Sequence, residues 1–210
     1  MARYETDEEK VEALKRWWKE NSTAVILGVV VGVGAIVGWR VWDGYQENRA
    51  QSASAVFEQL LMTVDAGIDP AAALALTERL AADYRPTPYA AFGLLVKARV
   101  ALEQGEIDEA QGALEGAIDA ARDPALARVA ALRLARLLVS VQDHDRALAV
   151  IEQHDDQGSF SGEFAALRGD IAVARGDIEQ ARAAYRLALA VGVSQTQLIE
   201  IKLADLPEPG

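Results

Sequence analysis

The sequence predicts an all-α protein, with a single transmembrane helix near the N-terminus followed by a solenoid of helical repeats. Three observations lead to this fold class. Residues 21–39 form an uncharged stretch of 19 residues with charged segments on both sides. The rest of the chain is rich in alanine and other helix-forming residues. Finally, a short Gly-acidic-Ile motif occurs twice in the C-terminal half, at an interval that suggests helical hairpin repeats.

The uncharged stretch has the length of a membrane span. Its apolar core, residues 24–39, reads AVILGVVVGVGAIVGW, and 19 helical residues cover roughly 28 Å, close to the thickness of a hydrocarbon core. Tryptophan rings, which prefer the headgroup level, bracket it at Trp17, Trp18, Trp39 and Trp42. A cleaved signal peptide would have a shorter apolar region and a cleavage site close behind it, whereas the nearest small-x-small pattern begins only at Ala53. We therefore expect an uncleaved anchor over residues 21–42, surrounded by the lipid bilayer.

The distribution of basic residues predicts the orientation of this anchor. Five of them precede the span, and in the 20 residues after Trp39 only Arg40 and Arg49 are basic. Because positive flanks stay in the cytoplasm, residues 1–20 should be cytoplasmic. Long domains cross largely regardless of their charge, so residues 43–206 should lie in the periplasm of a bacterial inner-membrane protein, with 207–210 as a tail.

The cytoplasmic arm, residues 1–20, has the pattern of an amphipathic helix. Val11, Leu14 and Trp18 recur on one face, and the charged residues lie on the other. This pattern favours a helix lying at the membrane surface. A docking site for a cytoplasmic partner stays open as the alternative.

Four glycines within the span give it two GxxxG spacings, Gly28 with Gly32 and Gly34 with Gly38. Small residues at this spacing let two helices approach closely in the membrane. We expect these spacings to allow a specific contact with another transmembrane helix, and a homodimer through Gly28 and Gly32 is left open.

The charge of the chain argues against nucleic acid as a partner. The formal net charge is -11, and residues 41–210 carry 15 basic and 26 acidic side chains, so the whole excess lies beyond the span. Affinity for nucleic acid comes largely from basic side chains that neutralise phosphates. We therefore expect no nucleic-acid binding.

The sequence shows no arrangement typical of catalysis or of cofactor binding. There is no cysteine, which excludes thiol chemistry and Cys-ligated zinc. His144 and His154 are ten residues apart, a spacing that does not suit a metal pair on one helix, and both lie in segments with loop composition. We expect no enzyme activity, no metal and no cofactor.

Helix starts can be placed at three prolines. Asp69-Pro70, Thr87-Pro88 and Asp123-Pro124 each put a capping side chain before a proline at the first helical position. Ser194 and Gln197 have the spacing of a capping box ahead of the apolar Leu198 and Ile201. These four sites divide the C-terminal part of the chain into helices.

The internal repeat has a period of about 34 residues. The segment 105–110 recurs as 176–181, an offset of 71 residues, or about two periods. A weaker intermediate copy at 143–147 places Ala147 between Ala110 and Ala181. Each copy lies between two helical patterns, so each should be the turn of a helical hairpin.

These hairpins resemble the tetratricopeptide repeat, in which small residues let paired helices pack closely. Two copies match the repeat well, through Ala98, Gly105, Ala110, Leu114 and Ala117 in one and Gly169, Gly176, Ala181, Tyr185 and Ala188 in the other. The middle copy has Ala135 and Ala147 but departs at His154, where a small residue is expected, so its second helix should be short. Residues 45–84 should form one more helix pair, and the helix after Ser194 should cover the end of the stack.

The resemblance to tetratricopeptide repeats implies a binding groove lined by the first helix of each unit. In this chain the corresponding residues are Phe92, Leu95, Arg99, Arg136, Val139 and Asp170. Phe and Leu at helical spacing are also typical of a core, so this alternative stays open for them.

The whole chain resembles the YfgM family of bacterial inner-membrane proteins. The resemblance lies in the arm YETDEEKVEALKRWWKEN, in the glycine-rich span that ends GWRVW, and in the alanine-rich repeats. It implies an ancillary subunit of the SecYEG translocon whose periplasmic domain helps to pass exported client proteins to chaperones, with the prolyl isomerase PpiD as a partner. A scaffold or assembly factor for another envelope complex is the alternative.

Overall fold

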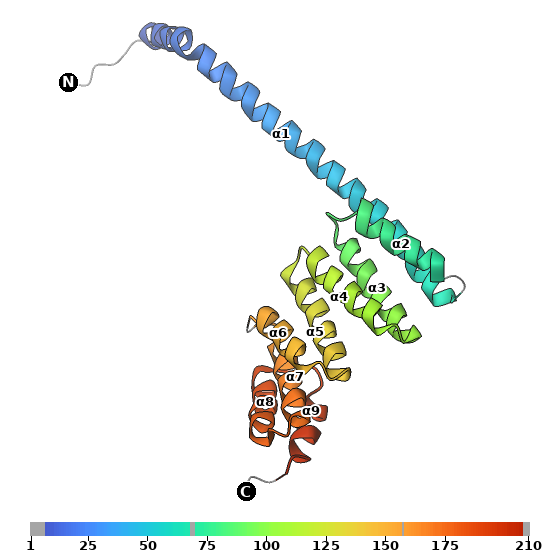
Figure 1. Ribbon diagram of the computed structural model, residues 1–210. Coiled ribbons are helices and arrows are strands. Elements are labelled where there is room, and N and C mark those ends of the chain that lie inside the picture. Colours follow the sequence, from blue (N-terminus) through green and yellow to red (C-terminus); the bar gives the residue numbers. More distant parts are fainter. Residues whose placement is uncertain (1–6, 68–69, 157, 208–210) are drawn as a thin grey trace, which may run out of the picture. The chain divides into compact units, whose positions relative to one another are not determined.

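The computed structural model describes residues 7–67, 70–156 and 158–207. Over these residues the chain is all-α, as the sequence predicts (Figure 1). The nine helices are α1 (Asp7–Ala66), α2 (Pro70–Asp83), α3 (Pro88–Gln104), α4 (Ile107–Ala120), α5 (Pro124–Ser140), α6 (His144–His154), α7 (Ser161–Ala174), α8 (Ile178–Val191) and α9 (Thr196–Ala204). The chain forms two compact units, Met1–Arg49 and Ala50–Gly210.

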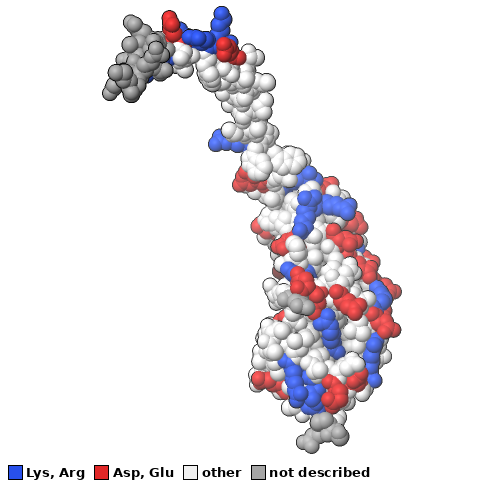
Figure 2. Space-filling view, turned by 90° about the vertical axis from the view of Figure 1, so that its left-hand side faces the viewer, with Lys and Arg blue, Asp and Glu red and all other residues white. Residues whose placement is uncertain are grey.

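The first unit contains the part of α1 that is long and apolar enough to cross a membrane. Mean hydropathy in this helix reaches 2.2, and the apolar segment is not buried against any other part of the chain. Val30, for example, is 61% exposed. Figure 2 shows this segment as a band of uncharged residues with charged residues on either side. Water would not favour so much contiguous exposed apolar surface, whereas a hydrocarbon core would.

The second unit begins with a helix pair made by the end of α1 and by α2. Ala53, Val56 and Leu60 of α1 form a buried cluster with Ala73 and Leu80 of α2. The first helix of the pair expected over 45–84 is thus the last part of α1 and not a separate helix. The reason is local, since no proline interrupts residues 45–66.

The predicted proline starts are confirmed, but not every predicted cap, and the cap residue Asp69 lies outside the described residues. Helices α2, α3 and α5 begin at Pro70, Pro88 and Pro124. The carboxylate of Asp123 accepts a hydrogen bond from the Ala125 N–H at 2.9 Å, as expected of a cap. The Thr87 cap was wrong, because its hydroxyl donates to the Tyr84 carbonyl at 2.7 Å and makes no cap bond to α3.

The predicted capping box at Ser194 and Gln197 is also wrong. Helix α9 begins at Thr196, and the Ser194 N–H donates to Glu163 of α7 at 3.0 Å. The Ser194 N–H, which a capping box would pair with the side chain of Gln197, is thus bonded to a residue of another helix. The helix does cover the end of the stack, but through Ile199, which is 3% exposed. Leu198 and Ile201, the apolar residues on which the prediction relied, stay exposed.

The three repeat turns use the same backbone conformation. Gly105 and Gly176 have φ angles of 79° and 78°, in the left-handed region that favours glycine. The equivalent residue of the middle copy is Gln142, which also has a positive φ of 64°. After two of these turns, the side chains of Asp143 and Asp177 accept cap bonds from the following helix. The middle copy therefore keeps the turn although it lacks the glycine.

Replacing Gln142 with glycine should stabilise the helical domain. A residue with a side chain costs roughly 1–2 kcal/mol in the left-handed conformation, and glycine avoids this cost. The larger conformational entropy of glycine in the unfolded state offsets part of that gain in stability. We expect a gain of about 0.5–1 kcal/mol in the free energy of unfolding, measured by denaturant titration of the full chain in detergent. The reverse change at an equivalent turn, Gly105→Gln, should lower stability by a similar amount. If Gln142→Gly left the free energy of unfolding unchanged or lowered it, backbone strain at Gln142 would be contradicted.

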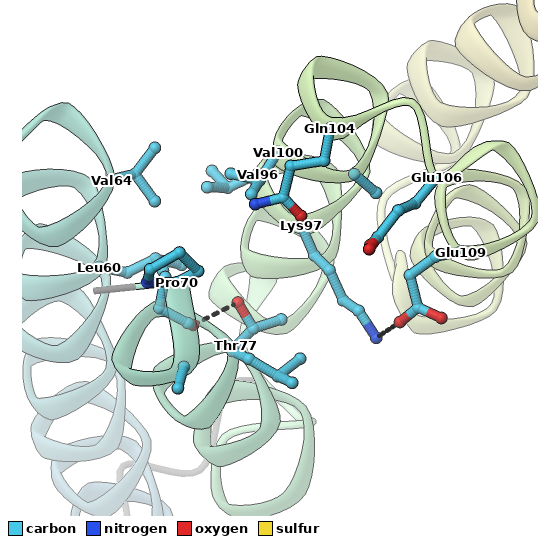
Figure 3. Close-up of a pocket in the computed structure, with 14 residues that line it drawn as sticks. Leu60, Val64, Pro70, Thr77, Val96, Lys97, Val100, Gln104, Glu106 and Glu109 are labelled. Carbon is cyan, nitrogen blue, oxygen red and sulfur yellow. Dashed lines mark hydrogen bonds and ion pairs between the residues drawn. The ribbon is translucent and has the colours of Figure 1, made fainter. Parts of the chain in front are cut away.

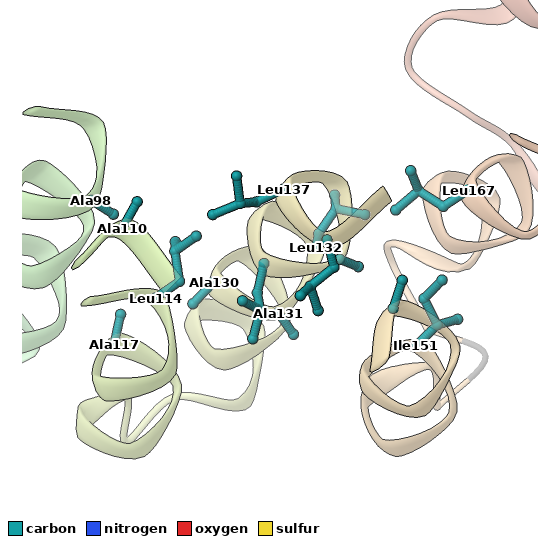
Figure 4. Packing of buried hydrophobic residues seen from close by; sticks show 14 of the residues in the cluster. Ala98, Ala110, Leu114, Ala117, Ala130, Ala131, Leu132, Leu137, Ile151 and Leu167 are labelled. Carbon is teal, nitrogen blue, oxygen red and sulfur yellow. The ribbon is translucent and has the colours of Figure 1, made fainter. Parts of the chain in front are cut away.

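The core is built from small residues at the repeat positions, as predicted (Figure 4). Ala110, Ala147 and Ala181, which occupy the same place in their hairpins, are all fully buried. In the first helices, Ala98, Ala135 and Gly169 are buried too. Helix α6 has 11 residues where α4 and α8 each have 14, which confirms the short second helix of the middle copy.

Candidate functional site

A groove runs between α3 and α5, the first helices of two successive hairpins. Its volume is about 500 Å³. Its floor is apolar and largely buried, and arginines stand at its rim. It is lined by Leu95, Ala98, Arg99 and Leu102 of α3, by Leu114 of α4, and by Arg133, Arg136, Leu137 and Ser140 of α5. A groove with a dry floor and a charged rim can hold apolar side chains and fix charged ones beside them.

A second hollow continues from this groove at Arg136. It has a volume of about 300 Å³ and lies between α5, α7 and α9, with Leu167, Asp170 and Lys202 among its lining residues. Because Arg136 lines both hollows, the two form one surface across successive first helices.

Asp170 in the second hollow is engaged within the fold. Its carboxylate accepts a hydrogen bond from the Tyr185 hydroxyl at 2.7 Å and two from the Lys202 ammonium at 2.7 and 2.9 Å. Burial and this carboxylate raise the pKa of Tyr185 far above its usual value, so the phenol stays protonated and donates. Asp170 thus joins α7 to α8 and α9, and its oxygens are already satisfied.

Comparison with known proteins places this fold in a family. A family profile described as a tetratricopeptide repeat-like domain matches residues 15–208. The chain is 31% identical over 208 residues to the ancillary SecYEG translocon subunit of Escherichia coli, covering 98% of this chain and 99% of that protein. It is 33% identical over 201 residues to the protein of the same name from Haemophilus influenzae, covering 95% and 97%. The corresponding Aggregatibacter actinomycetemcomitans protein is 33% identical over 200 residues, with the same coverage.

The chain belongs to the ancillary SecYEG translocon subunit family. The resemblance to YfgM and to tetratricopeptide repeats is thereby confirmed. For a family member of this kind, the repeat surface and the apolar helix are the parts to consider for function. The helix and the family together make the chain a membrane-anchored protein.

The structure brings only some of the predicted groove residues of this family member together. Leu95, Arg99 and Arg136 line the α3–α5 groove, and Asp170 lies in the adjoining hollow. Phe92 instead packs against the rings of Phe57 and Tyr89, with centroids 5.9 and 6.0 Å away. Val139 packs against the main core. The alternative that Phe and Leu at helical spacing belong to the core therefore applies to Phe92, and also to Leu95, which lines the groove but is a 7% exposed member of the main core.

Sequence reasoning missed several residues of the groove. Arg133 and Ser140 lie about one helical turn before and after Arg136, and Leu102 lies one turn after Ala98. Helical spacing from Arg136 could have found both neighbours on α5, because residues three and four apart share a face.

A separate pocket of about 330 Å³ lies on another side of α3 (Figure 3). It shares no lining residue with the groove, and Leu60, Val64, Leu74, Val96 and Val100 make it apolar. Three of its polar side chains are engaged internally, since the Thr77 hydroxyl donates to the Ala73 carbonyl and Lys97 pairs with Glu109. The pocket contains none of the predicted groove residues, and we therefore take the α3–α5 groove as the candidate site.

Both glycine pairs of the span, Gly28 with Gly32 and Gly34 with Gly38, are open. A Cβ added at Gly28, Gly32, Gly34 or Gly38 would meet no atom within 4 Å. Whether another helix packs there stays a prediction.

The described part of the chain holds no group of three or more His, Cys, Asp or Glu side chains that could bind a metal. His144 and His154 are the first and last residues of α6, at opposite ends of the helix. Burial lowers the pKa of His154 below its usual value. Neither histidine lines the groove.

Proposed function

We propose that this protein is a non-catalytic, membrane-anchored protein-binding module associated with the SecYEG translocon. The observation that carries the proposal is the match over nearly the whole chain to proteins named as ancillary subunits of that translocon. The α3–α5 groove supports the binding role, because it joins an apolar floor to a charged rim.

The proposal includes a topology. The five basic residues before the span favour a cytoplasmic N-terminus, which puts the repeat domain in the periplasm of an inner-membrane protein. There, we propose, the groove receives segments of exported client proteins and helps to transfer them to periplasmic chaperones such as PpiD. The open side of α1 that carries Gly28 and Gly32 would pack against a transmembrane helix of a partner.

Co-purification tests the association. Membranes that contain the tagged full chain are solubilised in a mild detergent, and the bound proteins are identified by mass spectrometry. We expect SecY, SecE and SecG above the level found with an unrelated tagged single-span protein. Repeated recovery at the control level would refute the association.

Two double variants in the same experiment examine the side of the span that carries Gly28 and Gly32. Gly28→Ile with Gly32→Ile adds bulk to the face, and Val29→Leu with Val33→Leu adds bulk elsewhere on the same helix turns. We expect the first pair alone to reduce the recovery of translocon subunits, or of a homodimer if that is the contact. Equal recovery with both pairs would dismiss this face.

A further inference from the structure

We propose that the α3–α5 groove selects acidic peptide segments, with Arg133 and Arg136 as the residues that bind carboxylates. The inference rests on the proposed function, in which the groove binds protein, and it names the chemistry of the bound segment. That segment would carry Asp or Glu side chains next to apolar ones.

The first argument is that these two arginines are unpaired. Both are exposed at the groove, and neither makes a hydrogen bond or ion pair with any residue that the structure describes. Most other basic side chains of the helical domain hold a carboxylate. The pairs are Arg79 with Asp83, Lys97 with Glu109, Arg99 with Asp65, Arg128 with Asp156, Arg146 with Glu115, Arg168 with Asp155, Arg175 with Asp145 and Lys202 with Asp170.

The second argument is that acidic side chains, which are abundant in the domain as a whole, are absent from this groove. Residues 41–210 carry 26 acidic side chains, yet no Asp or Glu lines this groove. In the adjoining hollow, Glu163 accepts the Ser194 N–H and Asp170 accepts Tyr185 and Lys202, so both carboxylates are engaged there. The groove is thus a local positive region on an acidic domain, and it would attract an acidic ligand.

The third argument comes from the spacing of the two side chains. Arg133 and Arg136 are three residues apart on α5, so their like charges lie on the same face and repel each other. A bound carboxylate would remove this repulsion. Guanidinium groups also suit the task, because their planar N–H groups can hold a carboxylate by two parallel hydrogen bonds.

The groove also selects for apolar groups next to the carboxylates. Leu95, Ala98, Leu114 and Leu137 are all less than 8% exposed and face the same space as the two arginines. Arg99 also lines the groove from α3, but its charge is already paired, because Asp65 and Glu103 lie 3.6 Å from it. A segment that alternates apolar and acidic residues fits both features.

Peptide binding to the full chain in detergent tests this inference. The probes are three fluorescent peptides of equal length that alternate leucine with glutamate, glutamine or lysine, and fluorescence anisotropy gives the dissociation constants. We expect the glutamate peptide to bind about tenfold more tightly than the glutamine peptide, and this advantage to shrink as salt is added. The lysine peptide should bind most weakly.

The decisive variant carries Arg133→Gln and Arg136→Gln. It should lose most of the preference for glutamate over glutamine while the affinity for the glutamine peptide stays the same. The matched control carries Arg85→Gln and Arg186→Gln, two exposed and unpaired arginines outside the groove, and so has the same net charge. The control should bind like the unchanged chain. Circular dichroism of both variants verifies that the helical domain is folded.

Two results would overturn the inference without touching the proposed function. One is equal affinity for the glutamate and glutamine peptides. The other is a preference that survives in the groove variant or disappears equally in the control. Recovery of translocon subunits by co-purification is scored separately, so a protein that associates with the translocon but shows either result keeps its proposed function and loses this specificity.

Discussion

A chain with Val30→Arg and Val33→Arg should no longer be held in the membrane. Each arginine near the centre of a span costs about 2.5–3.5 kcal/mol of insertion free energy, and each lost valine removes a small favourable contribution. Both valines are more than half exposed and lie outside the helical domain, so the change leaves the repeat core intact. We expect the variant to be released from membranes by alkaline carbonate.

The matched control for this prediction is Val30→Leu with Val33→Leu, which keeps the span apolar. The control should stay in the membrane pellet after the same extraction. If the arginine variant were retained as fully as the leucine control, residues 21–42 would not be the anchor.

The second large effect is expected at Gly169, where α7 packs closely against the Tyr185 ring of α8. An added Cβ would lie 2.5 Å from Cδ1 and 3.0 Å from Cζ of the Tyr185 ring. The ring cannot move aside easily, because Tyr185 is 2% exposed and its hydroxyl is bonded to Asp170. Gly169→Ala should therefore lower the free energy of unfolding by about 2 kcal/mol, despite the better helix propensity of alanine.

The control for Gly169 is another helical glycine. A Cβ at Gly112 in α4 would meet no atom within 4 Å, so Gly112→Ala should stabilise the domain by about 0.5–1 kcal/mol. Denaturant unfolding of both variants, as full chains in detergent, measures the difference. If Gly169→Ala were as stable as Gly112→Ala, the packing of α7 against α8 would not depend on the absence of a side chain at Gly169.

The parts of the fold that depend on local chemistry could be predicted from the sequence. A proline at the first helical position fixes a helix start, which is why α2, α3 and α5 begin where expected. The repeated turn was predictable in the same way, because Gly105 and Gly176 mark it. That Gln142 would adopt the same left-handed conformation did not follow from its own preference, because residues with a side chain disfavour that region.

The features that depend on long-range contacts could not be predicted. Asp170 and Lys202 are 32 residues apart, and their pairing depends on how α9 packs at the end of the stack. In the same packing the Ser194 N–H donates to Glu163, and α9 begins at Thr196, later than predicted. The candidate groove was predictable only to the extent that helical spacing on α3 and α5 shows which residues share a face. Helical spacing could not show that Phe92 packs in an aromatic cluster with Phe57 and Tyr89.

Site-specific photo-crosslinking in living cells tests the central claim most directly. A photoreactive amino acid is placed at Arg99 or Arg136 in the groove and, as the comparison, at Arg186 on α8, which lies outside it. We predict adducts from the groove positions with translocon subunits or with exported proteins, and few from Arg186. Adducts that name a different envelope complex would favour a scaffold instead. No adduct from either groove position, with adducts only from Arg186, would contradict the claim that this groove is the binding site.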